Sequence, residues 1–167
     1  MITPAYARTM AAYNTEMNRR LYAAAARLPD ADRRTDQGAF WTSLHGTLSH
    51  LLWADFQWMS RFANWPPPGV PLKQSATFVT GFDDLATRRI QADAGLEAWA
   101  AQLDPAWLAA DQTWWSGASN REMRAPRTIL VTHLFNHQTH HRGQAHALLT
   151  RAGQDPGATD LPFIIPH

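Results

Sequence analysis

The most informative part of the sequence lies near the C-terminal end and reads Asn136-His137-Gln138-Thr139-His140-His141-Arg142-Gly143-Gln144. The apolar residues around it recur at helical spacing, which predicts a helix from about Pro126 to Ala152 that ends at Gly153. On this helix His137 and His141 are four positions apart, so their rings lie on one face. Two imidazoles at this spacing can bind one divalent metal ion.

These two histidines take the place of leucines on the side of the helix that faces the core. Burying an imidazole costs free energy unless each ring nitrogen has a partner. A metal ion would be that partner for one nitrogen of each ring, and Gln144 faces the same way and could bind a metal-bound water or a ligand. His133 and His140 flank this side. His146 lies opposite, where we expect it to be solvated or at an interface.

Three further helices are predicted upstream from the same helical spacing of apolar residues. The first begins at Thr3-Pro4, a capping residue followed by proline, and stops by Pro29. The second runs from about Thr42 to Phe62, and the third covers roughly Phe82 to Leu103. The proline-rich residues 65–71 between them cannot be helical.

The segment between the third and fourth helices has a different character. Asp104-Pro105 begins a short turn or helix. Two short extended pieces, 112–115 and 121–124, then flank a Gly/Ser/Asn turn at 116–120, which predicts a small hairpin or ordered loop. With four long helices, the sequence predicts an all-α fold, a four-helix bundle that forms a single domain over residues 1–167.

The composition excludes several classes of protein. The chain has 15 basic and 14 acidic residues, a net charge of +1 and no basic block, so nucleic acid and anionic membranes are not expected partners. No apolar run approaches the roughly 20 residues of a membrane span, and no signal sequence is evident, so we expect a cytoplasmic location. Without cysteines, any metal must be bound by His, Asp or Glu.

The second helix offers a third metal ligand, His50. Gly46 and Ala54 lie one turn before and after it on the same face, and their small size would leave room for a metal ion and its water. Trp58, one turn further along, could wall the pocket, whereas His45 points to a different side of the helix. The alternative is a structural bundle in which the buried histidines satisfy one another without a metal.

The histidine-rich stretch resembles the NHxxHHRGQ block of the DinB/YfiT-like family. Further matches to this family occur over nearly the whole chain: Tyr13-Asn14 with Asn18 and Leu21, Leu48-Ser49-His50-Leu51 with Ala54-Asp55 and Trp58, and Asp160-Leu161-Pro162. The resemblance implies a metal-binding four-helix bundle whose ligands are His50, His137 and His141. It also implies a homodimer. His140 corresponds to a position that is often tyrosine in relatives, so it is not counted as a ligand.

Three neutral histidines leave a divalent ion its full charge, and such an ion lowers the pKa of a bound water toward ~7 or holds a thiolate. Zinc is the first expectation, and nickel suits a more open site. The carboxylate-bridged di-iron site of ferritin-like bundles is not expected, because the chain has only Glu16, Glu97 and Glu122.

The main functional hypothesis is therefore a metal-dependent enzyme of the thiol S-transferase or hydrolase type. Some relatives use low-molecular-weight thiols such as bacillithiol or mycothiol, so such a thiol or another small molecule is the expected partner. No catalytic acid or base can be assigned from the sequence. The alternative is a non-catalytic bundle protein of the stress response that binds a metal or a ligand.

Two further expectations concern Arg142 and the tryptophans. Arg142 points away from the metal-facing side, so we expect it to pair with an acid, either Asp55 or Asp160. The chain contains eight tryptophans. Five of them are candidates for the lining of a pocket, although large rings more often fill a bundle core: Trp53, Trp58, Trp65, Trp114 and Trp115.

Overall fold

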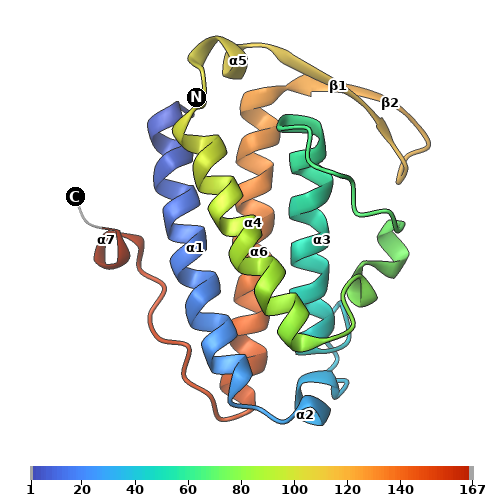
Figure 1. Ribbon diagram of the computed structural model, residues 1–167, viewed down its shortest axis with the longest axis vertical. Coiled ribbons are helices and arrows are strands. Elements are labelled where there is room, and N and C mark those ends of the chain that lie inside the picture. The colour runs from blue at the N-terminus through green and yellow to red at the C-terminus, as the bar shows by residue number, and fades with distance from the viewer. Residues whose placement is uncertain (1, 166–167) are drawn as a thin grey trace.

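Four long helices make up most of the protein, whose computed structural model describes residues 2–165 (Figure 1). They are α1 (Pro4–Ala26), α3 (Leu44–Phe62), α4 (Phe82–Ala101) and α6 (Arg127–Arg151). Helix α1 packs against α4 and α6, and α3 packs against the same two helices. The four predicted helices are thus confirmed, and α1 and α3 lie on opposite sides of the α4–α6 pair.

The starts of α1 and α3 are fixed by side-chain caps. Thr3 accepts a hydrogen bond from the backbone N–H of Tyr6 at 3.2 Å, and Pro4 occupies the first helical position. Ser43 caps α3 by accepting from the N–H of Gly46 at 3.1 Å. The start of α3 lies two residues beyond the approximate position that was predicted, because Thr42 has a φ of 64°, which no right-handed helix contains.

Short elements join the long helices. Helix α2 (Asp30–Arg34) follows α1, the 3-10 helix η1 (Leu72–Thr77) precedes α4, and α5 (Pro105–Ala109) and α7 (Leu161–Ile164) lie nearer the C-terminus. The proline-rich residues 65–71 are not helical, as predicted.

The predicted hairpin is confirmed between α5 and α6. Strands β1 (Asp111–Ser116) and β2 (Arg121–Pro126) pair antiparallel, with Trp114 opposite Met123. In Figure 1 this hairpin extends beyond one end of the long helices, next to the C-terminal end of α3. The fold is therefore mostly helical with one small two-stranded sheet among the described residues.

The buried residues form two apolar clusters at different levels along the helices. One contains Leu21, Leu48, Leu85 and Leu149, and the other contains Ala11, Met59, Leu96, Leu134 and Phe135. Each long helix has polar residues between these two sets, namely Asn14 and Asn18 in α1, His50 and Asp55 in α3, Arg89 and Asp93 in α4, and His137, Gln138 and His141 in α6. A polar layer therefore separates the two halves of the core.

Helix α6 has a second apolar side, formed by Val131, Phe135 and Leu149. Each of these side chains is at most 1% exposed within this one chain. Their burial is explained by the other helices and needs no partner subunit. Among residues 2–165, no helix is long and apolar enough to cross a membrane.

Candidate metal centre

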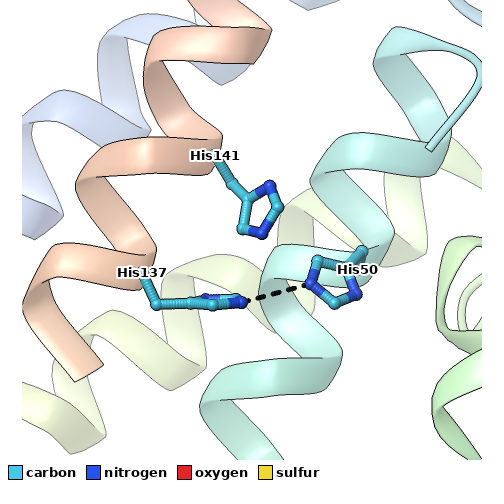
Figure 2. Close-up of side chains that lie close together, drawn as sticks. All are labelled: His50, His137 and His141. Carbon is cyan, nitrogen blue, oxygen red and sulfur yellow. Dashed lines mark hydrogen bonds between the residues drawn. The ribbon is translucent and has the colours of Figure 1, made fainter. Parts of the chain in front are cut away.

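Three histidine rings converge between α3 and α6 (Figure 2). His50 comes from α3, and His137 and His141 come from one face of α6, one turn apart. The Nε2 atoms of His50 and His137 are 3.3 Å apart, and one nitrogen from each of the three rings lies within 4.8 Å of the others. The structure thus brings together the three residues that the sequence indicated as metal ligands.

Two of the rings are held by hydrogen bonds to their Nδ1 atoms. Nδ1 of His141 donates to Oε1 of Gln144 at 2.7 Å, which leaves the lone pair of its Nε2 free. Nδ1 of His50 lies 2.8 Å from Oγ of Ser75 in η1. Such partners fix the orientation of a metal-binding imidazole. Gln144 therefore acts on His141, whereas the sequence suggested that it binds a metal-bound water or a ligand.

Burial keeps the rings neutral. His50 and His141 are buried, and His137 is partly exposed. Loss of solvation, followed by repulsion from His141, lowers the pKa of His50 to about 3. The same causes lower the pKa of His137 to about 3. Burial also lowers the pKa of His141, although its hydrogen bond to Gln144 opposes this. Neutral imidazoles are the form that binds metals.

The positions of these nitrogens fit a divalent ion. Two nitrogens that bind one tetrahedral zinc ion at its usual bond length stand about 3.3–3.4 Å apart, which matches the separation of the His50 and His137 Nε2 atoms. Nδ1 of His137 is buried without a partner among the described residues. The neutral nitrogen donors suit zinc, nickel and similar ions, and no carboxylate belongs to the cluster.

The other histidines lie outside the cluster. The His133 ring packs edge-on against Trp58 with 5.1 Å between ring centroids, and His140 is exposed. His146 is half-buried, and its Nε2 lies 3.1 Å from the carbonyl oxygen of Gly157 in the C-terminal segment. His45 points elsewhere, as predicted, and its Nε2 lies 2.8 Å from the carbonyl oxygen of Val79.

Gly46 has a different role from the one expected. A Cβ atom at this position would lie 2.3 Å from the carbonyl oxygen of Trp41, so the missing side chain makes room for the preceding loop and not for a metal ion. The loop places the Trp41 ring on His50, stacked at 3.9 Å between centroids. Sequence reasoning missed both Trp41 and Ser75, because each acts on His50 from outside the helix that carries it.

The expected ion pair of Arg142 is also wrong. Arg142 is buried and donates to Oδ1 of Asn14 and, at 3.2 Å, to Oγ1 of Thr139. Asp55 is not available to it, because Asp55 accepts from Arg89 at 2.5 Å and from Gln138 at 2.8 Å. Asp160 lies on the exposed C-terminal segment, and no ion pair with Arg142 occurs among residues 2–165.

These contacts belong to a buried polar network that the sequence analysis did not anticipate. Arg89 of α4 forms ion pairs with Asp55 of α3 and, at 2.8 Å, with Asp93. Asp93 also accepts from the side-chain amides of Asn14 and Asn18 in α1. With Gln138 of α6, the network joins all four long helices. Burial disfavours the charge on Arg89, but the two carboxylates outweigh it and raise its pKa.

Four of the five tryptophans considered for a pocket line the same cavity. Trp53, Trp58, Trp114 and Trp115 border a cavity of about 990 Å³ beside the histidine cluster. Trp65 borders a different cavity and touches Gly95, where a Cβ would lie 2.5 Å from its ring. Trp53 is also buried in the core, and Trp58, Trp65 and Trp114 pack against the core clusters, so most of these rings fill the core as expected while also lining a cavity.

The chain was compared with known families and proteins. The model of the DinB family matches residues 1–166. No curated protein and no solved structure matches the chain.

Proposed function

The chain belongs to the DinB family, and from this premise we propose that it is a metal-dependent enzyme whose divalent ion is bound by His50, His137 and His141. The observation that carries the proposal is the convergence of three neutral imidazoles from two helices on one point. Zinc or nickel fits this donor set best.

The proposed reaction is a thiol S-transfer or a hydrolysis. When bound, the ion would supply the Lewis acidity that lowers the pKa of a water or thiol into the neutral range. The protein's own contribution is to hold the ligands. Gln144 and Ser75 orient two of the rings, and the Trp41 ring covers one face of His50 and keeps water from it. A low-molecular-weight thiol or another small molecule would be the partner.

One observation favours the second candidate, a non-catalytic protein that binds a metal or a ligand in the stress response. The buried carboxylates Asp55 and Asp93 are both paired with Arg89, so neither is free to act as a general base. A panel of thiol-transfer and hydrolysis reactions on metal-loaded protein separates the two candidates. Persistent inactivity at full metal occupancy would favour the binding protein.

We also propose that residues 1–167 form a single four-helix-bundle domain and that the protein is a homodimer. The pairwise packing of α1, α3, α4 and α6 supports the bundle, and family membership supports the dimer. Sedimentation equilibrium should give twice the mass of one chain. A monomer at all concentrations would exclude the dimer and leave the metal proposal untouched.

The metal proposal is tested by elemental analysis of protein purified without an affinity tag. We expect about one divalent ion per chain, and replacing His50, His137 or His141 by alanine should abolish binding because too few ligands remain. His140→Ala and His146→Ala are the matched controls on the same helix and should retain the ion. If the control variants lose the metal while His137→Ala keeps it, the ligand assignment is wrong.

A further inference from the structure

The cavity beside the histidine cluster has aromatic walls from distant parts of the chain. Trp53 and Trp58 come from α3, Trp114 and Trp115 come from the hairpin, and Trp41 comes from the loop before α3. Its volume of about 990 Å³ is near the upper end of the range of small-molecule sites, about 300–1,000 Å³. A hairpin that lies outside the long helices thus forms one wall of a site.

This cavity adjoins the three histidines. Trp41 lines it and stacks on His50, and Trp53, another lining residue, has its ring centroid 6.0 Å from that of His50. His133 also lines it, and its ring centroid is 5.7 Å from that of His137. A molecule in the cavity would therefore lie next to the cluster, separated from it by single side chains.

The charged groups of the cavity are all positive. Arg61 and Lys73 line it, and no Asp or Glu of the described part of the chain does. The Arg61 guanidinium lies over the Trp58 ring at 4.5 Å and is 5.7 Å from the centre of the Trp114 ring. Among residues 2–165, no carboxylate forms an ion pair with it. Arg61 is thus a cation that is held by aromatic rings and lacks a counter-charge.

We propose that the cavity binds a small organic anion with a flat apolar body, and that Arg61 receives the anionic group. The tryptophan rings would stack on the flat body, and a planar guanidinium matches a carboxylate with two parallel hydrogen bonds. The proposal rests on the proposed function, since it names the substrate class of the same site. An organic cation could also stack on the tryptophan rings, but Arg61 and Lys73 would repel it, so it is disfavoured.

The test is isothermal titration of the metal-loaded protein with three probes. These are 2-naphthoate, its neutral counterpart 2-naphthamide, and acetate, which has the charge without the apolar body. We expect naphthoate to bind about tenfold more tightly than the amide, because only the anion makes charge-assisted hydrogen bonds with Arg61. Acetate should bind at least tenfold more weakly than naphthoate. Equal affinities for naphthoate and naphthamide would overturn the proposal.

Matched variants assign the contact to particular residues. Arg61→Gln should remove the preference for the anion, whereas Arg151→Gln, at the other end of α6 from the hairpin, should keep it. Trp115→Ser should weaken the binding of naphthoate and of naphthamide by the same factor. Trp115 is 63% exposed, so this change spares the fold. Circular dichroism and metal content of each variant should match those of the unaltered protein.

The role of the metal is separated by repeating the titrations after chelation. Preference for the anion that persists without metal and disappears in Arg61→Gln supports the proposal. A preference that is lost on chelation but survives Arg61→Gln means that the carboxylate binds the ion, which overturns the assignment to Arg61. Protein that binds no metal yet shows the Arg61-dependent preference would refute the proposed function and leave this binding site standing.

Discussion

At the scale of single residues, the three histidines differ in what binds their second ring nitrogen. Gln144 accepts from His141, and Ser75 lies beside Nδ1 of His50, but His137 has no such partner among the described residues. The orientation of His137 is therefore set by packing and by the contact of its Nε2 with Nε2 of His50 at 3.3 Å. A single substitution of Gln144 or Ser75 would remove the hydrogen bond that orients His141 or His50.

Gln144→Leu removes the acceptor of His141 and keeps the size of the side chain. We expect the metal affinity to fall by about 10–100-fold, because the loss of a partner that orients a ligand typically costs this much. The affinity is measured by competition with a chelator of known strength. Gln144→Glu, which retains an acceptor oxygen, should restore most of it.

The matched control is Gln91→Leu, a change on the exposed side of α4. Its metal affinity should equal that of the unaltered protein. If Gln144→Leu behaves in the same way as this control, the hydrogen bond to Gln144 has no part in metal binding.

At the scale of elements, the polar layer joins the long helices to one another. Within this layer Arg89 links α4 to α3 through Asp55, and Asp93 links α4 to α1 through Asn14 and Asn18. Gln138, next to His137 in the sequence, binds the same Asp55. The layer therefore fixes how α6 is rotated toward α3, and with it the direction in which His137 and His141 point.

Arg89→Met leaves two buried carboxylates without their counter-charge. Removing one partner of a buried ion pair costs about 3–5 kcal/mol, and we expect the free energy of unfolding to fall by this amount. The matched change is Arg88→Met, which breaks an exposed pair with Asp84 at 3.0 Å. An exposed pair contributes at most about 1 kcal/mol.

Unfolding in urea, followed by circular dichroism, gives both values. Equal losses for the two variants would mean that the buried layer contributes no more than a surface pair. A loss confined to Arg89→Met would confirm that the layer stabilises the fold.

The long helices could be predicted from the sequence because their apolar residues recur at one period and their ends carry local signals. Thr3-Pro4 and Gly153 are such signals, and both helix ends lie where they indicated. The hairpin was predictable for the same reason, since the turn residues 116–120 separate two extended pieces. The polar layer was not predictable from the sequence. Its contacts join residues of different helices, such as Asn14, Arg89 and Asp55, and they form only when three helices are packed together.

The candidate metal centre was predictable to the extent that it depends on helix periodicity and on resemblance. His137 and His141 share a face by their spacing alone, and the structure places both opposite His50. Trp41, Ser75 and Arg61 carried no comparable signal. Trp41 contacts His50 from a loop and Ser75 contacts it from η1, whereas Arg61 lines the adjoining cavity from the last turn of α3, and only the folded chain brings them there.

At the scale of the whole molecule, the three ligands connect α3 and α6, which come from opposite halves of the chain. An ion that binds only the folded protein stabilises it by mass action, by about 2.7 kcal/mol at a free concentration 100 times its Kd. For a protein of this size that corresponds to a rise in Tm of about 5–10 °C. We expect this rise when zinc is added to chelated protein, as followed by differential scanning calorimetry.

The substitution His137→Ala should abolish the rise in Tm, because the remaining His50 and His141 hold the ion too weakly to favour the folded state. His140→Ala, an exposed change one residue from His141, should show the full rise. A rise that persists in His137→Ala and vanishes in His140→Ala would place the stabilising ion on the surface of α6. An ion at that surface would contact one helix only, so it could not connect α3 to α6. The convergence of the three rings would then be a feature of core packing alone.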